Sequence, residues 1–312
     1  EDCMDGPFDS PYTYFHADVT IDGQTAQDIG VRKKALIGSQ STTKPGLKLN
    51  IDEYVDGAEL FDVDNITLNN SVQDPSLIRQ CMGYAVFEAA GIPASKCNFA
   101  RVAVNGDDYG IYVHVEPVKR AFLRDHFGDE SGDLYEGTLS DFRENWVNTF
   151  DPKTGDTDTA LTGPKAIKDA LTLNDEDFLT QVSTLIDLES YINFWATEIL
   201  VGHWDGYAGN NNNYFIYRNP ADNLFHFIPW GVDGVMYADY AELEPFVASA
   251  LPNRLLDIPE TYDMLAARIN TLLDTVWDED ALLAEVDRME DLLADEIFLE
   301  SESYTQIDDV RT

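Results

Sequence analysis

Two acidic residues and a run of asparagines interrupt otherwise apolar parts of this sequence. In the segment EILVGHWDGYAGNNNNYFIYRNP, Asp205 precedes four consecutive asparagines, residues 210–213. Asparagine favours neither helices nor strands, so local folding preference does not explain the run. A second acid, Asp233, interrupts the apolar segment FHFIPWGVDGVMY. Carboxylate and amide oxygens at the ends of buried segments are what a divalent cation that holds a polyphosphate requires.

The spacing of these residues fits two interpretations. Asp205 and Asn210 are five residues apart after a predicted helix, as are the base and the metal ligand of a protein kinase catalytic loop. Asp233 follows a predicted pair of strands, as the metal-holding acid does in that arrangement. However, each acid is followed by glycine, and Asp-Gly is a common turn pair. Spacing alone fits ordinary turns at least as well.

Basic residues gather near the start of the chain. A quarter of the 20 lysines and arginines fall within 17 residues, namely Arg32, Lys33, Lys34, Lys44 and Lys48. Lys48 lies between two leucines on a predicted strand, so its amine projects to the face opposite them. At least one of these side chains binds phosphate, or all of them decorate an exposed strand. The sequence leaves both interpretations open.

The predicted elements are strands followed by helices, with one early helix and a late hairpin. The helix over 74–91 has Asp74 as its expected N-cap and Pro75 at its first position. A turn at Asn105-Gly106 joins two strands across 98–117. The remaining expectations are strands over 12–22, 29–38 and 46–52, helices over 118–128, 175–183 and 187–202, an acidic loop over 149–163, a hairpin over 213–230 and two helices within 260–300.

The order of these elements predicts an α+β, protein-kinase-like fold with two lobes. The N-terminal lobe, 1–117, is expected to be mainly an antiparallel sheet with one helix, and the C-terminal lobe, 118–312, mainly helical. A short connector at Glu116-Pro117-Val118 joins the two. No G-x-G-x-x-G loop lies near the start. The segment IGSQSTTKPG (37–46) is the nearest candidate for covering phosphates.

Composition excludes several classes of partner. The net charge of −38 over 312 residues argues against a nucleic acid or an anionic membrane surface, and it suits a salty or extracellular setting. There is no run of 18 apolar residues that would span a membrane. The three cysteines have no metal-binding spacing. Cys81 and Cys97 are predicted to be core residues, unless Cys3 pairs with one of them in an oxidising compartment.

Several blocks of the sequence together resemble the CotH kinase family, which is named for a bacterial spore-coat protein. These blocks are VRKKALIGSQSTTKPGLKLNIDEY, LNNSVQDPSLIRQCMGYAVFEAAGIPASKCNFARVAVNGDDYGIYVHVEPVKRAFL, GDLYEG and GHWDGYAGNNNNYFIYRNPADNLFHFIPWGVDGVM. The resemblance runs from about Val31 to Met236. It implies an atypical kinase that uses ATP and Mg²⁺ to phosphorylate Ser or Thr of secreted or coat proteins. It also implies an extracellular or cell-surface location, with a signal or lipoprotein segment removed. The oligomeric state is not predicted.

The resemblance assigns a role to each candidate site residue. Lys48 and Arg79 are expected on the nucleotide phosphates, Glu116 near the adenine, Asp205 as the base that accepts the substrate hydroxyl proton, and Asp233 on Mg²⁺. The amide ligand of the metal is either Asn210, which fits kinase spacing, or Asn213, which fits the family pattern and is favoured.

One position departs from the family pattern. Where the family often has Trp-Asp-x-Asp, this chain has Trp230-Gly231-Val232-Asp233. If the missing acid contributes to metal binding, the site is weakened or inactive. Two alternatives to a protein kinase therefore stand beside it. One is a kinase fold kept for surface adhesion without catalysis, and the other is AMP transfer or nucleotide hydrolysis by the same site.

Overall fold

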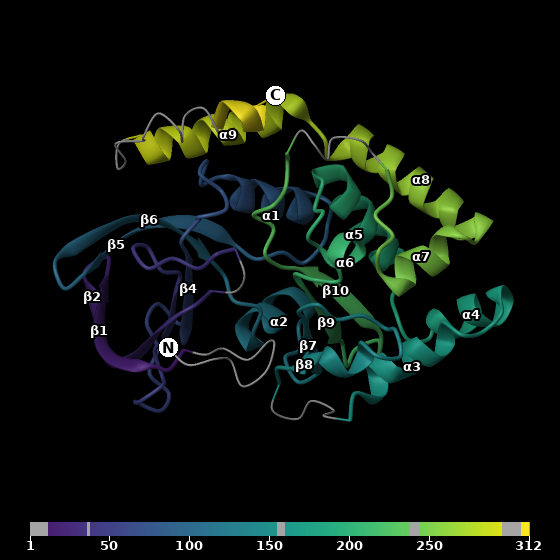
Figure 1. The fold of residues 1–312 in the computed structure, drawn as a ribbon, viewed down its shortest axis with the longest axis horizontal. Helices are drawn as coiled ribbons and strands as arrows, with labels where there is room; N and C mark the ends of the chain where they lie inside the picture. The colour runs from purple at the N-terminus through teal and green to yellow at the C-terminus, as the bar shows by residue number, and fades with distance from the viewer. Residues whose placement is uncertain (1–11, 36–37, 155–159, 238–243, 295–306, 312) are drawn as a thin grey trace. The chain divides into compact units, whose positions relative to one another are not determined.

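The computed structural model describes residues 12–35, 38–154, 160–237, 244–294 and 307–311, and the chain groups into two compact units (Figure 1). The first unit is Glu1–Leu77, Lys96–Pro117 and Asp291–Gln306, and the second is Ile78–Ser95, Val118–Glu290 and Ile307–Thr312. Residues 78–95 thus group with the second unit, although we expected them in the first lobe. The lobe boundary at Pro117 stays a prediction.

The first unit is built on a six-stranded antiparallel sheet in the order β1-β2-β3-β4-β6-β5. Its strands are β1 (Phe15–Ile21), β2 (Gln24–Lys33), β3 (Leu47–Asn50), β4 (Asn65–Asn69), β5 (Cys97–Val104) and β6 (Asp107–Val115). The expected antiparallel sheet and the hairpin turn are confirmed, and Asn105 and Gly106 have the positive φ values, 54° and 91°, of a tight β-turn. Strand β4 was not predicted.

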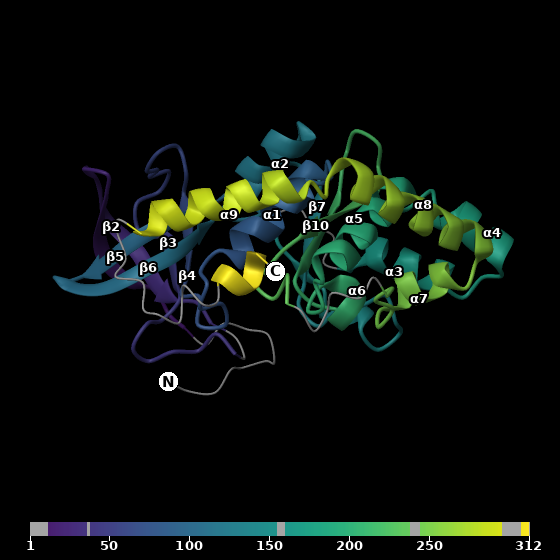
Figure 2. The same cartoon turned by 90° about the horizontal axis from the view of Figure 1, so that it is seen from above.

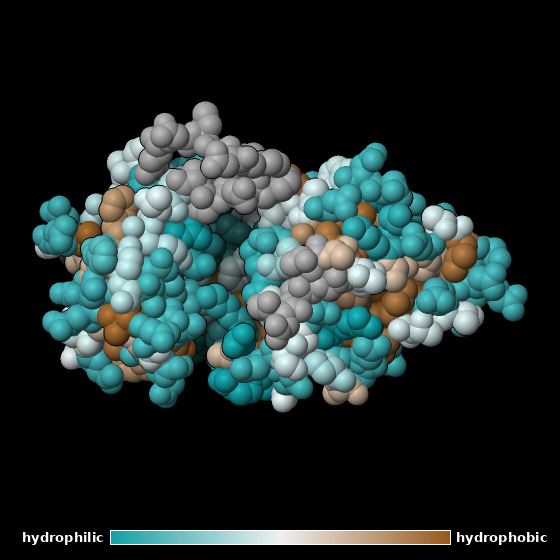
Figure 3. Space-filling model, turned by 90° about the horizontal axis from the view of Figure 1, so that it is seen from below, coloured by the Kyte–Doolittle hydropathy of each residue, from teal (hydrophilic) through white to brown (hydrophobic). Residues whose placement is uncertain are grey.

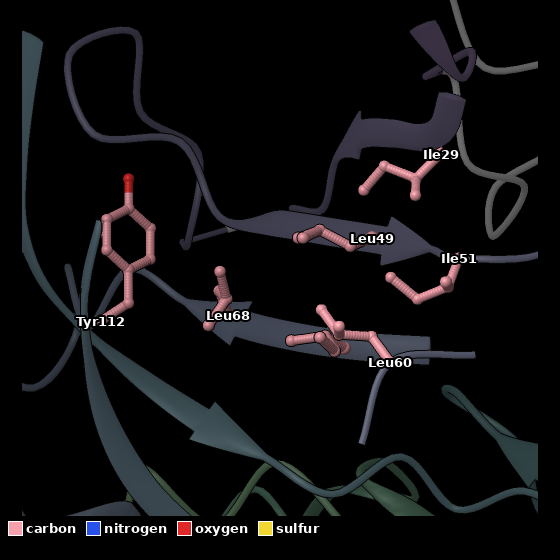
Figure 4. Packing of buried hydrophobic residues seen from close by; sticks show 7 residues of the cluster. Ile29, Leu49, Ile51, Leu60, Leu68 and Tyr112 are labelled. Carbon is pink, nitrogen blue, oxygen red and sulfur yellow. The ribbon is translucent and has the colours of Figure 1, made fainter. Parts of the chain in front are cut away.

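Apolar side chains from several strands form the core of this sheet (Figure 4). The buried cluster is Ile29, Leu49, Ile51, Leu60, Ile66, Leu68 and Tyr112. Because side chains alternate along a strand, Lys48 lies on the face opposite Leu49. Its register partners on that face are Arg32 of β2 and Thr67 of β4. The predicted alternation around Lys48 is therefore confirmed.

The second unit is mainly helical around a four-stranded antiparallel sheet, in the order β10-β9-β7-β8. Helix α8 lies along α5 and α7 packs on α8 (Figure 2). The elements are α1 (Arg79–Ala89), α2 (Arg120–Phe127), β7 (Asp133–Gly137), β8 (Asp151–Pro152), α3 (Thr162–Ala170), α4 (Asp175–Val182), α5 (Leu188–Val201), α6 (Tyr207–Asn210), β9 (Tyr214–Arg218), β10 (Phe225–Pro229), α7 (Ala250–Leu256), α8 (Pro259–Thr275) and most of α9 (Glu279–Ala294), with a 3₁₀ turn over Val147–Thr149. Its core is aromatic, with Tyr191, Tyr207, Tyr214 and Phe227 all buried.

Two local predictions were wrong. Helix α1 begins at Arg79, because the Asp74 carboxylate accepts the backbone N–H of Ser76 and Leu77 has a φ of 68°, which places a turn before the helix. Cys97 is only partly buried and is therefore not a core residue, whereas Cys81 is buried as predicted, and both cysteines are disulfide-bonded. Cys3 lies outside the described residues.

The surface reflects the composition of the chain. On the face drawn in Figure 3 hydrophilic residues predominate, and hydrophobic ones are scattered in small groups. Within the described ranges, every helix is too short or too polar to cross a membrane.

Candidate active site

Asp205 lies in a tight connection between helices α5 and α6 of the second unit. Helix α5 ends at Gly202, which has the left-handed conformation typical of a helix C-cap, with a φ of 66°. Helix α6 starts after Gly206 and spans one turn. The predicted break in regular structure at Asp205 is therefore present, and the partly exposed carboxylate stands between two helix ends.

Three asparagine amides surround the Asp205 carboxylate. Asn210 Nδ2 donates to Asp205 Oδ1 at 2.6 Å. Asn213 Nδ2 donates to Asp205 Oδ2 at 2.8 Å and to the Asp205 main-chain oxygen at 3.1 Å. Asn212 Nδ2 makes the longest contacts, 3.3 and 3.4 Å to the two carboxylate oxygens. Because an ionised carboxylate can only accept, each amide turns its NH₂ group toward Asp205 and its oxygen elsewhere.

Two of the amide oxygens are occupied by structural contacts. Asn211 Oδ1 accepts from Arg143 Nη2 and from Ser249 Oγ, both at 2.8 Å. Asn212 Oδ1 accepts the backbone N–H of Leu139 at 3.4 Å. These contacts anchor the asparagine run to the neighbouring 139–143 segment and to the residue before α7. The amide oxygens of Asn210 and Asn213, the two predicted candidates, take no part in these anchoring hydrogen bonds.

The Asn213 oxygen is directed at the loop that carries Asp233. A Cβ atom at Gly231 would lie 2.5 Å from Asn213 Oδ1, and Gly231 has a φ of 53°. Both the close approach and the left-handed backbone favour glycine. The glycine at this position therefore has a packing reason, since it lets the Asn213 amide reach the loop two residues before Asp233.

Helix α1 supports the same loop from another side. A Cβ at Gly83 would lie 3.0 Å from Val232 and 3.2 Å from Val235, so the helix is in close contact with the residues on either side of Asp233. Arg79, at the start of α1, stacks over Tyr237 with its Cζ 4.2 Å from the ring centroid. Burial, and then the charge of Asp233, raises the pKa of the Tyr84 hydroxyl well above its ordinary value, which keeps this phenol protonated.

The second unit thus brings together most of the predicted site. Asp205, Asn210 and Asn213 are in direct contact, Asn213 abuts the Asp233 loop, and Arg79 contacts the segment that follows this loop. Lys48 and Glu116 belong to the first unit. The Glu116 carboxylate accepts the backbone N–H of Lys96 at 3.0 Å. Their convergence with Asp205 and Asp233 stays a prediction.

Asn70 anchors the segment proposed to cover phosphates within the first unit. Asn70 Nδ2 donates to the main-chain oxygens of Ser39 and Lys44, at 2.9 and 2.8 Å. Lys44 Nζ lies 5.2 Å from the centroid of the Tyr112 ring, and burial lowers the pKa of this amine. Tyr112 belongs to the apolar core cluster together with Leu49, and Lys48 points to the face opposite Leu49. Lys44 and Lys48 therefore lie on opposite faces of the sheet.

The oxygen donors on Asn213 and on the loop of Asp233 suit a metal ion that takes its remaining ligands from phosphate and water, as Mg²⁺ does. Among the described residues, no group of three or more His, Cys, Asp or Glu side chains is placed to hold a metal ion. Mg²⁺ in nucleotide sites is instead held by one or two protein oxygens together with phosphates and water. An amide oxygen aimed at a loop that carries a carboxylate matches that requirement.

Three supporting residues were missed from the sequence. Asn212 is a third donor to Asp205, Tyr84 lies next to the Asp233 loop, and the buried Glu198 accepts backbone N–H groups shortly after Asp205. Glu198 did leave a signal, because it is a charged residue inside the apolar helical stretch FWATEILV. Nothing in the sequence singles out Tyr84 from other buried aromatics.

Comparison with known proteins identifies relatives of the chain. The family described as CotH kinase protein matches residues 23–310. The inner spore coat protein H of Bacillus subtilis (strain 168) is 26% identical over 215 residues, which cover 62% of this chain and 58% of that protein. From Rhizopus delemar, Invasin CotH2 is 21% identical over 65% of this chain and 34% of its own length, and Spore coat protein homolog 1 is 24% identical over 69% and 40%. The match spans less than two thirds of each relative.

Two solved structures share a distant likeness. One is a chain of the HipA, HipB and operator DNA complex of Shewanella oneidensis MR-1, with 12% identity, a TM-score of 0.39, and coverage of 79% of this chain and 55% of that one. The other is the Helicobacter pylori proinflammatory kinase CtkA, with 10% identity, a TM-score of 0.40, and coverage of 90% and 91%. Likenesses of this size do not establish a shared activity.

Proposed function

The chain belongs to the CotH kinase protein family, and from that premise we propose that it is an ATP- and Mg²⁺-dependent phosphotransferase. Its reaction transfers the γ-phosphoryl group of ATP to a Ser or Thr hydroxyl of a protein substrate. The observation that carries this proposal is the arrangement of Asn213, which donates its amide N–H to Asp205 and aims its oxygen at the loop of Asp233. A single amide thereby links the proposed base to the loop that carries the proposed metal ligand.

In this proposal Asp205 orients the acceptor hydroxyl and takes its proton. Orientation of the acceptor hydroxyl is the larger part of this role. Asn212 makes the longest contacts to the carboxylate, at 3.3 and 3.4 Å, and these are the ones that an incoming hydroxyl replaces at least cost. Asn210 and Asn213 keep the carboxylate in place meanwhile.

Asp233 and Asn213 would hold Mg²⁺, while Lys48 and Arg79 would neutralise phosphate charge and Glu116 would lie near the adenine. Bound Mg²⁺ supplies charge neutralisation on the transferred group. In a chain with a net charge of −38, such local cations and metal ligands are needed to hold a nucleotide at all.

We place the protein outside the cell or on its surface. Two of its three cysteines, Cys81 and Cys97, are disulfide-bonded, and disulfides persist in oxidising compartments. The strong negative charge agrees with a secreted protein. Mass spectrometry tests this location. Protein isolated from its native source under thiol-blocking conditions should contain Cys81 and Cys97 in disulfide form.

A second candidate function is surface binding without catalysis. One relative is named an invasin, and Gly231 replaces an acid of the family pattern. The packing of Gly231 against Asn213 weakens this candidate, because the glycine has a role in that contact besides standing in place of an acid.

Calorimetry of ATP binding with and without Mg²⁺, on the wild type and on Asp233→Ala, tests the proposal. Asp263→Ala is the matched control, since Asp263 is an exposed acid on helix α8 of the same unit. We expect Mg²⁺-dependent binding that Asp233→Ala abolishes and Asp263→Ala retains. Absence of ATP binding by the wild type would support surface binding instead.

A second assay separates the possible transfers. Dephosphorylated casein is incubated with ATP labelled on either the α- or the γ-phosphorus. Protein labelling by γ-labelled ATP alone supports phosphoryl transfer, labelling by α-labelled ATP indicates AMP transfer, and release of phosphate without protein labelling indicates hydrolysis.

A further inference from the structure

Glu198 is a carboxylate buried inside helix α5, seven residues before Asp205. Its exposed fraction is 0%, and it lies within the largely apolar helical stretch FWATEILV. A buried carboxylate is costly unless hydrogen bonds or opposite charge compensate it. Helix packing alone would therefore favour an apolar residue at this position.

Both oxygens of Glu198 accept backbone N–H groups from the start of helix α6. Oε1 accepts from Tyr207 at 2.8 Å, and Oε2 accepts from Ala208 at 3.1 Å. The first N–H groups of a helix have no partner within the helix itself. Helix α6 has no side-chain cap at its own N-cap residue, Gly206, so Glu198 supplies the cap from another helix.

The carboxylate is packed tightly against the residues around Asp205. His203 Nδ1 lies 3.5 Å from Glu198 Oε1, and both side chains are fully buried. A Cβ at Gly206 would lie 2.1 Å from Glu198 Oε1 and 2.5 Å from His203 Nδ1. Gly206 thus lets the chain that carries Asp205 lie directly on the buried carboxylate and imidazole.

We propose that Glu198 is a positioning residue that sets the orientation of Asp205. The inference rests on the proposed function, since it assigns Glu198 a role in that reaction. Asp205 immediately precedes the capped segment, and Asn210, which donates to Asp205 at 2.6 Å, ends the same one-turn helix. The proposed base and one of its amide donors therefore lie at the two ends of the turn that Glu198 fixes. Small displacements of such groups reduce turnover strongly.

Glu198→Gln tests the proposal with little change in shape. The glutamine side chain has one acceptor oxygen, so one of the two backbone N–H groups loses its partner. Glu189→Gln is the matched control on the same helix, because Glu189 has an 81% exposed side chain that pairs with Arg268 at 3.2 Å. Three quantities are measured: amide hydrogen exchange at residues 207 and 208, the Kd for ATP with Mg²⁺, and kcat for casein phosphorylation.

For Glu198→Gln we expect faster exchange at residue 207 or 208 and a fall in kcat of about 100-fold, with Kd changed by less than about twofold. Glu189→Gln should leave all three unchanged. A merely structural role would lower thermal stability and weaken ATP binding together with kcat, which would overturn the proposal. Unchanged exchange at both amides, or unchanged kcat, would also overturn it.

Gly206→Ala provides a second test if Glu198→Gln does not fold. The added methyl group would collide with the Glu198 carboxylate and the His203 ring and so force the turn and the carboxylate apart, and we expect the same separation of kcat from Kd. If the wild type does not bind ATP with Mg²⁺, the proposed function fails on its own. The exchange measurements then still decide whether Glu198 fixes the turn, because they require no activity.

Discussion

Replacement of Gly231 by alanine should damage the site through one identifiable contact. Gly231 has a φ of 53°, at which an alanine costs about 1–2 kcal/mol. The new Cβ would lie 2.5 Å from Asn213 Oδ1, so the amide must move. Moving it breaks the 2.8 Å bond from Asn213 Nδ2 to the Asp205 carboxylate, and hydrogen bonds to charged groups contribute about 1.5–3 kcal/mol. The free energy of unfolding should therefore fall by about 2.5–5 kcal/mol.

A matched variant separates backbone strain from displacement of Asn213. Gly128 ends helix α2 with a φ of 74°, and a Cβ there would meet nothing within 4 Å. Gly128→Ala therefore has the strain of about 1–2 kcal/mol without the collision. Urea unfolding at equilibrium gives the free energy of both variants, and calorimetry gives their affinity for ATP in the presence of Mg²⁺. Only Gly231→Ala should lose that affinity, by about tenfold or more.

Two results would refute this reasoning. Equal destabilisation by both substitutions would mean that Asn213 tolerates the methyl group without losing its bond to Asp205. Destabilisation by Gly231→Ala with unchanged Mg²⁺-dependent ATP affinity would mean that the Asn213 oxygen is not a metal ligand. Asn210, the other predicted amide, would then take its place as the candidate.

Two further predictions concern stability. Asn211→Ala removes the acceptor for Arg143 and Ser249 and puts alanine at a φ of 55°. Urea unfolding should therefore show that the free energy of unfolding falls by about 3–5 kcal/mol. Asn211→Gly should lose less, because glycine has no backbone strain at this φ. Burial lowers the pKa of His114 below its ordinary value of 6.5, so just below pH 6.5 the unfolded chain binds a proton that the folded chain does not. The contribution of His114 to the free energy of unfolding is therefore highest above pH 6.5 and decreases as the pH falls below that value. His114→Gln should reduce this slope by at most about 1.4 kcal/mol per pH unit, and an equal slope in both proteins would contradict the prediction.

The parts of the fold that could be predicted are those with strong local signals. Alternating strands, the Asn105-Gly106 turn and the long apolar helix ending at Gly202 all follow from side-chain periodicity and turn chemistry. Strand β4 and the two-residue strand β8 could not be predicted, because pairing with distant strands, not local pattern, makes them strands. The late start of α1 depends on a side-chain turn at Asp74 that mimics a helix cap in sequence.

The sequence singled out the acids and amides of the candidate site but not the residues that support them. Asp205, Asn210 and Asn213 were singled out by residue type and spacing, and the structure places their polar groups in contact. Spacing alone could not choose between the two asparagines, because only the folded chain shows that the Asn213 oxygen faces Gly231. Nor could it assign Glu198, whose partners are backbone groups that only the folded connection between α5 and α6 brings near.

The run of asparagines is explained by two requirements that few residues meet together. Asn211 and Asn213 both have left-handed backbone, with φ values of 55° and 52°, a conformation that glycine, asparagine and aspartate adopt most readily. The positions around Asp205 also need neutral donors to its carboxylate. Aspartate would add like charge next to Asp205, and glycine would supply no amide. At residue 213, where both requirements apply, asparagine combines a tolerated left-handed backbone with an uncharged donor and an oxygen that can contact another group.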